Sequence, residues 1–409
     1  MTPTVEATGA AMSFRCRMCS TSTTVPALAL GRLPVCNAFG QDGRVERQVD
    51  LDIVECESCG LIQLAAAPGP ESLMPEVPWI RYREPEGHLD ALVDELIRLR
   101  PEATTAFGAG PFEQPLLTRL QTRHFTTDLL PLDGASPPGR YPYLETWQAR
   151  LDAAQLSAAA ARHGPFDIVS CRYLIEHTPD PVRALRALKP LVKPDGLLLI
   201  EVPDSSKFLA ARDYCFLWEE HSSYFVEDTL RRLAEVSGCR VLALLRYPGA
   251  LEDALVAVLT TAEGPPPPVA PQGPSRLFQT YRDEFAGIRA GVRSKLTALA
   301  GPDRDRIALF GVGHHAIMFV NAFGLSDLIA LAVDDDADKN GFFPPGWRVP
   351  VVGSEALLAD ERIRLCLFAV APHIEGKVRD KLAALTARGV AFRSIYAALD
   401  NSIMKDPAP

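Results

Sequence analysis

Two pairs of cysteines near the N-terminus have the spacing of a metal site. Cys16 and Cys19 form one C-x-x-C pair, and Cys56 and Cys59 form a second. Two thiolates in such a pair can bind one ion from a single turn, and two pairs supply the four tetrahedral ligands that Zn²⁺ prefers. The alternative is two chance pairs of reduced thiols, but the repeated spacing favours zinc. Cysteine would fill all four positions, so we expect the zinc to be structural.

Glutamate and histidine residues further along the chain have the chemistry of proton transfer. Glu220 and His221 are adjacent, and Trp218 and Tyr224 flank them. These aromatic neighbours favour a walled pocket over an exposed ion pair at the start of a helix. His177 lies just before a predicted helix, where it would either face a site or cap that helix. These residues are the first candidates for an active site.

A glycine turn offers a candidate nucleotide site. Gly108, Ala109 and Gly110 follow a predicted strand at residues 104–107, and Asp128 lies in the next predicted strand. Glycines let a ligand approach the backbone, and a carboxylate on the second strand can bind ribose hydroxyls. Tight strand-to-helix turns also use glycine without any ligand, so the turn alone leaves both interpretations open.

The elements that must hold these residues alternate between strands and helices. Apolar strands are predicted at residues 104–107, 124–130, 166–170, 196–202 and 240–246. Helices are predicted at residues 116–120, 181–191 and 229–237. Continuous apolar strands separated by helices are typical of a mostly parallel sheet that is covered on both faces.

A second alternation follows a proline-rich stretch. Residues 265–268 are four consecutive prolines, which cannot enter a helix or a central strand and favour an extended spacer. A long amphipathic helix is predicted beyond it at residues 275–300. Later strands are predicted at residues 306–310, 328–333, 365–370 and 391–396. The chain is therefore expected to be an α/β protein with a second doubly wound unit.

The composition limits the classes of function. The chain has 409 residues and a net charge of −9, with no basic block, which argues against a nucleic acid partner. No apolar run approaches the ~20 residues of a membrane helix, and no secretory signal is visible. Nine cysteines, four of them in C-x-x-C pairs, suit a reducing compartment. We expect a cytoplasmic protein that contacts neither nucleic acid nor membrane.

One ordered string is far more specific than these patterns. Residues 167–181 have the form D-x-V-x-x-x-x-x-x-E-H-x-P-D-P, and residues 196–203 have the form G-x-L-x-x-E-V-P. This string resembles the fourth and fifth strands of class I S-adenosylmethionine-dependent methyltransferases. With the cysteine pairs in front of it, the chain resembles the nucleotide-sugar C-methyltransferases of deoxysugar pathways over nearly its full length.

Two further segments carry the same resemblance. Residues 218–225 resemble the family's Y-H-E-H-x-S-Y-F motif, and residues 309–346 resemble its C-terminal G-x-G…N…V-D…K-x-G…P-G pattern, with Asn321 in place. The resemblance implies an N-terminal zinc module, a central methyltransferase domain and a C-terminal Rossmann-like domain. The expected boundaries are 1–70 for the zinc module, 71–262 for the methyltransferase-like domain, 263–274 for the proline-rich linker and 275–409 for the Rossmann-like domain.

The resemblance also implies a reaction on a nucleotide-linked keto-deoxysugar. In the family, a base removes the proton beside a ketone, and the resulting enolate attacks the methyl group of S-adenosylmethionine. A histidine has a suitable pKa for this base. By resemblance His221 is the base, with Glu220 beside it to raise its pKa and His177 across the cleft. Tyr82 is matched to a family tyrosine that reaches the sugar.

Further contacts follow from the same resemblance. The expected cofactor contacts are Gly108, Ala109, Gly110, Asp128 and Cys171. The expected substrate contacts are Trp218, Tyr224, His315 and Asn321. His314 and His315 are adjacent at a predicted helix start, where two side chains diverge and rarely bind one metal together. They would either contact a substrate phosphate or remain solvated. The expected partners are S-adenosylmethionine, structural Zn²⁺ and a nucleotide sugar, and the chain is expected to be a monomer or a weak homo-oligomer.

Several positions depart from the family pattern. The family's first motif is similar to E-I-G-S-N-D-G, but residues 106–112 lack the acid before the glycines and the N-D pair after them. Trp218 replaces a tyrosine, Glu219 replaces a second histidine, and the turn at Gly313 lacks a lysine. A divergent C-methyltransferase is the function we expect. The alternatives are a relative that performs other enolate chemistry, such as epimerisation or elimination, or only binds a sugar nucleotide, and a non-catalytic assembly partner.

Overall fold

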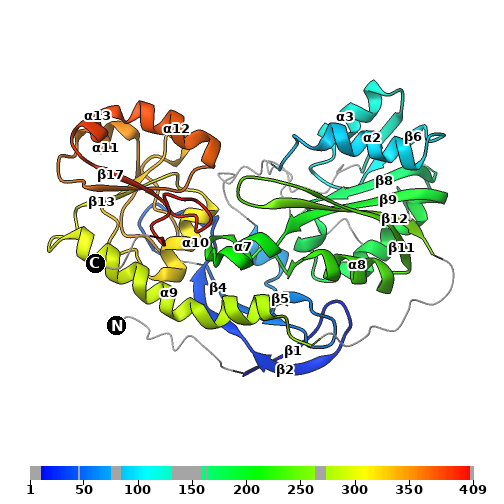
Figure 1. Cartoon of the computed structure of the whole chain (residues 1–409), viewed down its shortest axis with the longest axis horizontal. Coiled ribbons are helices and arrows are strands. Elements are labelled where there is room, and N and C mark those ends of the chain that lie inside the picture. The colour runs from blue at the N-terminus through cyan, green and yellow to red at the C-terminus, as the bar shows by residue number, and fades with distance from the viewer. Residues whose placement is uncertain are drawn as a thin grey trace.

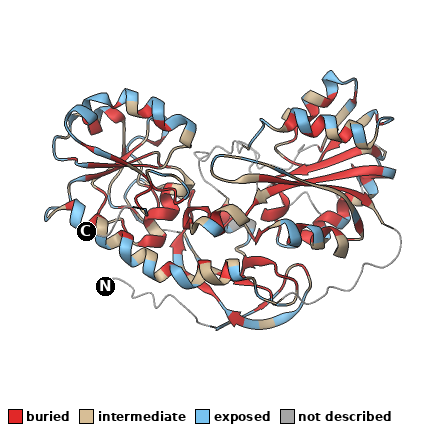
Figure 2. Ribbon diagram, in the orientation of Figure 1, coloured by how far each residue is buried: buried red, intermediate tan, exposed pale blue. Residues whose placement is uncertain are grey.

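The chain folds into two α/β lobes that lie side by side, with the N-terminal strands below them in the view of Figure 1. The computed structural model describes residues 11–44, 47–74, 84–130, 156, 158–159, 161–162, 164–262 and 273–405. Much of the predicted linker, residues 263–272, lies outside this described part. The buried residues gather in the strands of both lobes and in the helix faces that cover them (Figure 2).

The central lobe is built on a six-stranded sheet with the order β11-β12-β9-β8-β6-β7. Its strands are β6 (Thr105–Gly108), β7 (Thr126–Leu129), β8 (Phe166–Arg172), β9 (Val192–Asp204), β11 (Cys239–Tyr247) and β12 (Asp253–Thr261). Strands β7, β6, β8 and β9 are parallel, as predicted, while β12 is antiparallel to β9 and β11. β12 is not among the predicted strands, because a continuous apolar run does not by itself distinguish a strand from a buried helix.

Helices cover both faces of this sheet. They are α2 (Leu89–Leu99), α3 (Gln114–Thr122), α6 (Pro181–Leu188) and α8 (Glu227–Val236). Leu197 and Leu199 of β9 share a core cluster with α2 and α3. The alternate residues Leu198 and Ile200 share another with α6 and α8. Successive strand residues point to opposite faces, so a continuous apolar strand fills both cores.

The C-terminal lobe has a five-stranded parallel sheet with the order β15-β14-β13-β16-β17. Its strands are β13 (Ile307–Phe310), β14 (Leu331–Val333), β15 (Val351–Val352), β16 (Leu365–Phe368) and β17 (Ala391–Ser394). Its helices are α9 (Arg276–Ala300), α10 (His314–Phe323), α11 (Ser354–Ala359), α12 (Pro372–Lys381) and α13 (Ala383–Ala387). This is the second doubly wound unit that the sequence predicts.

The N-terminal strands form two small sheets. One pairs β1 (Ala11–Arg15) with β2 (Ser22–Pro26). The other has the order β10-β5-β4-β3 and contains β3 (Leu28–Pro34), β4 (Gln48–Glu55), β5 (Ile62–Leu64) and β10 (Ser223–Tyr224). β10 comes from the central part of the chain, so the zinc module and the central lobe share a sheet.

Short elements complete the described part. They are α1 (Pro70–Leu73), α7 (Ser206–Ala211) and the 3-10 helices η1 (Ile175–His177), η2 (Lys189–Leu191), η3 (Tyr214–Phe216) and η4 (Ala337–Lys339). After the linker, the Ser275 amide donates to the carboxylate of Glu55 at 2.9 Å, which ties the start of α9 to the zinc module. None of the described helices is both long enough and apolar enough to span a bilayer.

Candidate active site

A cavity of about 480 Å³ is lined by residues of both lobes. The central lobe contributes the predicted residues His177, Trp218, His221 and Tyr224, and the C-terminal lobe contributes the predicted His315. His314, considered with His315 from the sequence, lines it too. Further lining residues that the sequence did not single out as site residues include Glu84, Tyr173, Glu176, Glu252 and Lys339. Most of the predicted catalytic and substrate residues therefore meet in one cavity.

The loop that carries His221 is held on two sides. The Tyr224 hydroxyl donates to the Trp218 carbonyl at 3.0 Å and accepts from the Trp218 amide at 2.9 Å, which closes the loop around His221. On the other side, the Leu64 amide donates to the Ser222 carbonyl at 3.1 Å, and β10 pairs with β5. The zinc module thus positions the loop that leads into the cavity.

The second part of the site is the turn after β8. Its 3-10 helix η1 ends in Glu176 and His177, which are 2% and 6% exposed. His177 Nδ1 lies 3.0 Å from the backbone carbonyl of Glu220, and the Ser222 hydroxyl donates to the Glu176 carbonyl at 3.0 Å. These bonds tie η1 to the His221 loop, so His177 faces the site rather than simply capping a helix.

The imidazoles meet at close range. The rings of His177 and His221 have centroids 4.5 Å apart and are nearly perpendicular, at 88°. His314 stacks on Trp218 with centroids 4.0 Å apart. His315 Nδ1 lies 3.0 Å from the Tyr396 hydroxyl. The four imidazoles line the cavity with Trp218, one of the aromatic residues that favoured a walled pocket.

Burial keeps these imidazoles neutral. It lowers the pKa of His221 to about 3, with a further contribution from His315, and it lowers the pKa of His315 to about 4. The pKa of His177 is also far below its usual value, mainly through burial. The expectation that an adjacent carboxylate raises the pKa of His221 is therefore wrong, because desolvation dominates. A neutral imidazole has the free lone pair that a base needs.

The two acids before His221 point elsewhere. A Glu219 carboxylate oxygen accepts from the Cys36 amide at 2.6 Å, and a Glu220 oxygen accepts from the Asn37 side-chain amide at 3.2 Å. Both side chains are buried toward the zinc module, and neither lines the cavity. Within the described contacts, Glu220 fastens the loop with its side chain and orients His177 with its carbonyl.

Acidic residues that line the cavity are the residues that sequence reasoning missed. Both side-chain oxygens of Glu176 are buried and have no hydrogen-bond partner in the described structure. Burial raises the pKa of Glu176 well above its usual value. Burial also raises the pKa of Glu84 to about 8 and that of Glu252 to about 7. Glu176 is part of the E-H motif, but only its neighbour His177 was predicted to be a site residue.

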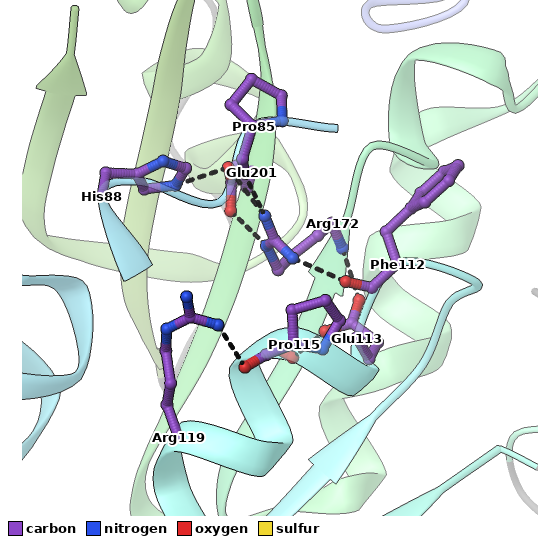
Figure 3. A network of polar contacts seen from close by, with 9 residues as sticks. Pro85, His88, Phe112, Glu113, Pro115, Arg119, Arg172 and Glu201 are labelled. Carbon is purple, nitrogen blue, oxygen red and sulfur yellow. Dashed lines mark hydrogen bonds and ion pairs between the residues drawn. The ribbon is translucent and has the colours of Figure 1, made fainter. Parts of the chain in front are cut away.

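The glycine turn lies at the end of β6, and a network of buried charges fills the space beside it (Figure 3). A Cβ atom added to Gly108 would lie 2.5 Å from the Cβ of Glu113. Glu113 accepts from the Arg172 amide at 2.7 Å and from the Ser170 hydroxyl. The glycines are thus needed for the close approach of Glu113.

Arg172 is the centre of this network. Its guanidinium pairs with Glu201 and donates to the backbone carbonyls of Phe112 at 2.6 Å and Pro85 at 3.1 Å. His88 Nε2 lies 2.8 Å from Glu201. Burial opposes these charges, but the His88 and Arg172 contacts keep the pKa of Glu201 below its usual value. Every charged side chain in the network has a partner.

The chemistry of the turn suits the amino-acid end of S-adenosylmethionine. The strand order puts this turn at the position where doubly wound sheets bind nucleotides. Glu113 supplies a carboxylate at the glycines, although the acid before them is absent, and a carboxylate can bind the donor's ammonium group. Asp128 is half-buried beside Phe107 on the neighbouring strand, where a ribose hydroxyl could be bound. These residues would hold the donor.

The remaining predicted residues have other surroundings. Cys171 is fully buried in the core beside Val169 and Leu174. The Asn321 side-chain amide donates to the Pro345 carbonyl at 2.9 Å, so this residue braces a loop of the C-terminal lobe. Tyr82 lies outside the described residues.

The four paired cysteines meet as predicted. Cys16 Sγ lies 3.5 Å from Cys59 Sγ, and Cys19 Sγ lies 3.6 Å from Cys56 Sγ. All four sulfurs lie within 4.8 Å of one another. This cluster fits Zn²⁺ with four thiolate ligands and no open position.

Comparisons with known proteins match the three parts in order. A zinc binding domain matches residues 16–73, a methyltransferase domain matches residues 94–244, and a C-methyltransferase C-terminal domain matches residues 273–395. The chain therefore carries, in order, the three domains of an S-adenosylmethionine-dependent C-methyltransferase, and zinc and S-adenosylmethionine are its cofactors.

Particular relatives agree with this class. The C-methyltransferase NovU of Streptomyces niveus is 26% identical over 366 residues, which cover 83% of this chain and 86% of the relative. The ubiquinone biosynthesis O-methyltransferase of Albidiferax ferrireducens is 50% identical over 56 residues, 13% of this chain and 22% of the relative. Among solved structures, the 1,6-didemethyltoxoflavin-N1-methyltransferase of Burkholderia thailandensis has a TM-score of 0.30 and 14% identity, covering 44% of this chain and 80% of that chain. A similarity of this size supports no conclusion about substrate.

Proposed function

We propose that this C-methyltransferase acts on a carbon beside the ketone of a nucleotide-linked keto-deoxysugar, with His221 as the base. The observation that carries the proposal is the neutral imidazole of His221 at the wall of a cavity that both lobes line. A neutral base with a low pKa is weak toward an isolated C–H bond. A neutral imidazole can accept a proton that an adjacent carbonyl acidifies.

The proposed steps balance within the site. His221 takes the proton from the carbon beside the carbonyl, and the electron pair of that C–H bond becomes the double bond of an enolate. The carbonyl π pair moves to oxygen, which needs a hydrogen-bond or proton donor. S-adenosylmethionine supplies the electrophilic methyl group when it is bound. His177, held by the Glu220 carbonyl, is placed to orient the substrate beside His221.

The C-terminal lobe offers groups for the nucleotide end. Helix α10 begins at the cavity, where Gly313 is its N-cap in an extended conformation. The N-terminus of a helix attracts phosphate through its free amides and its dipole. His314, His315 and Lys339 line the cavity around it. These features support a diphosphate-linked substrate, with Trp218 and Tyr224 as walls for the sugar.

Replacing the base tests the proposal. We expect His221→Asn to lower methyl transfer to thymidine diphosphate-4-keto-6-deoxyglucose, used as the probe, by about 10²- to 10⁴-fold. The melting temperature should stay close to that of the wild type. His373→Asn, on the exposed side of α12, is the matched control and should keep full turnover. Retained turnover in His221→Asn would refute the base assignment.

Calorimetric titration with S-adenosylhomocysteine separates this function from its runner-up. Micromolar binding supports the transferase. No binding, combined with proton exchange beside the ketone, would instead favour epimerisation or another enolate reaction on the same scaffold. The observation that favours this second candidate is the glycine turn, because the Glu113 side chain packs against Gly108 and Gly110 where the methyl donor would bind.

The three matched domains also support the predicted division of the chain. We propose 1–70 as the zinc module, 71–262 as the methyltransferase domain, 263–274 as the linker and 275–409 as the C-terminal domain. The monomeric or weakly associating state and the cytoplasmic location stay predictions.

A further inference from the structure

We propose that Glu176, His177 and His221 form a second metal site, which binds a divalent transition cation such as Zn²⁺ inside the cavity. One ligand atom from each of the three side chains lies within 4.8 Å of the other two. This site is separate from the four-cysteine cluster. It differs from that cluster in its ligands, in its place at the cavity and in what it would do.

The donor set has the composition of a functional metal site. Two imidazoles and one carboxylate bind Zn²⁺ in hydrolytic enzymes, where a fourth position stays open. The same set, arranged on one face, binds other first-row cations with open positions. A four-cysteine cluster, by contrast, leaves no room for a further ligand. The composition therefore indicates a site that can bind an outside oxygen atom.

The carboxylate of Glu176 is an independent sign of a missing partner. The residue is only 2% exposed, and it lines the cavity. Neither of its oxygens has a hydrogen-bond partner in the described structure. A buried carboxyl group without a partner is costly, and its ionised form more so, unless a cation or a donor satisfies it. A metal ion beside the two imidazoles would satisfy it.

His177 is oriented as a metal ligand usually is. One ring nitrogen, Nδ1, lies 3.0 Å from the backbone carbonyl of Glu220. A hydrogen bond from Nδ1–H to this carbonyl fixes the tautomer and leaves Nε2 unprotonated. Metal-bound histidines usually have such a hydrogen bond on the nitrogen that does not bind the metal. This orientation leaves the other ring nitrogen, Nε2, as the atom that would bind the metal.

The backbone around the three ligands is braced. The Ser222 hydroxyl donates to the Glu176 carbonyl at 3.0 Å, so η1 and the His221 loop are tied together next to the ligands. Ligand atoms around a tetrahedral zinc ion lie roughly 3.4 Å apart. The three ligand atoms lie within 4.8 Å of one another, so binding requires them to close by at most about 1.4 Å. Rotamer adjustment can supply this without moving the braced backbone.

The open side of the proposed site faces the cavity, so its fourth ligand would come from a molecule bound there. An oxygen of a bound substrate, from a carbonyl or from neighbouring hydroxyls, would complete the coordination. If His221 is the base, as proposed above, a metal ion and a substrate proton compete for the same lone pair. That part of the inference rests on the proposed function, and it predicts that metal loading inhibits turnover.

Metal content measured on the full-length protein tests the site. Wild type, Glu176→Gln and His373→Ala are dialysed to equilibrium against micromolar Zn²⁺ and analysed by plasma mass spectrometry. We expect about two zinc ions in the wild type and in the His373→Ala control, and about one in Glu176→Gln. One zinc ion in the wild type, or two in Glu176→Gln, would overturn the proposal.

Melting curves guard against a folding artefact. Glutamine has nearly the same shape as glutamate, so Glu176→Gln should fold and melt at or above the wild-type temperature without added metal. A ligand that binds only the folded state stabilises it, so added Zn²⁺ should raise the melting temperature of the wild type but not that of Glu176→Gln. Equal rises in both proteins would contradict the site.

Activity distinguishes a failure here from a failure of the proposed base. Two zinc ions with lost turnover support both the site and His221 as the base. Two zinc ions with turnover that depends on the second ion would keep the metal site and overturn the base assignment. One zinc ion with a strong His221→Asn defect would overturn the metal site and keep the base.

Discussion

The glycine turn and the cavity both contain buried carboxyl groups, but the two regions differ in whether those groups have hydrogen-bond partners. At the turn, Glu113 has two hydrogen-bond donors, and Glu201 is paired with Arg172 and His88. In the cavity, Glu176 has no hydrogen-bond partner in the described structure. Buried polar groups are normally satisfied, so the difference separates carboxyl groups that hold the fold from a carboxyl group that has room for a ligand.

The first motif, at the glycine turn, obtains its carboxyl group from another part of the chain. The motif lost an acid before the glycines, and the fold supplies another from the start of α3. The replacement is locked into a network with Arg172 (Figure 3). Donor binding at the turn must therefore either use this network as it stands or displace part of it.

Breaking the network should give the largest loss of stability. Arg172 is 1% exposed, and Arg172→Met leaves the buried carboxylates of Glu201 and Glu113 without their cation. Removing one partner of a buried pair costs about 3–5 kcal/mol. Urea unfolding measures the loss. Arg98→Met, which removes an exposed ion pair on α2, is the control and should change stability little. Equal effects of the two changes would show that the network is not structural.

A change at Glu113 should have a smaller effect that depends on pH. Burial raises the pKa of Glu113 to about 7 in the folded chain, whereas an unfolded glutamate has a pKa near 4.3. Between these values the folded state binds more protons, so this group makes stability fall as pH rises, by at most about 1.4 kcal/mol per pH unit. Glu113→Gln removes that dependence.

Unfolding at two pH values checks this prediction. The stability of Glu113→Gln relative to the wild type should increase from pH 5 to pH 7. A constant difference would mean that Glu113 ionises normally in the network. The same variant should bind S-adenosylhomocysteine more weakly if its carboxylate holds the donor's ammonium group, and calorimetry measures that change.

The smallest effect on stability should come from Glu176. Since its carboxylate has no hydrogen-bond partner to lose in the described structure, Glu176→Gln should leave the free energy of unfolding unchanged within about 0.5 kcal/mol, or raise it. Thermal unfolding without added metal is the measurement. A loss as large as that of Arg172→Met would erase the distinction between the two regions.

The sequence predicted what local motifs specify. The C-x-x-C pairs and the alternation of strands and helices follow from short strings, and both are found in the fold. His177, Trp218 and His221 line one cavity, and their roles stay predictions. Short-range patterns could not show that β10 joins the zinc module's sheet, because its partner β5 is distant in the sequence.

The directions of side chains could not be predicted from the sequence either. Glu220 is next to His221 in sequence, yet its carboxylate bonds to Asn37 rather than lining the cavity. The pKa of His221 depends on burial by both lobes, which no local pattern reports. The partners of Glu113 and Arg172 likewise come from segments that only the folded chain brings together.

Exchange of the substrate proton with solvent is the most direct test of His221 as the base, because it needs no methyl donor. Thymidine diphosphate-4-keto-6-deoxyglucose is incubated with the protein in D₂O, and proton NMR follows the signal beside the ketone. The account predicts that wild-type protein accelerates loss of that signal and that His221→Asn does not. Equal exchange rates in the two proteins would contradict it.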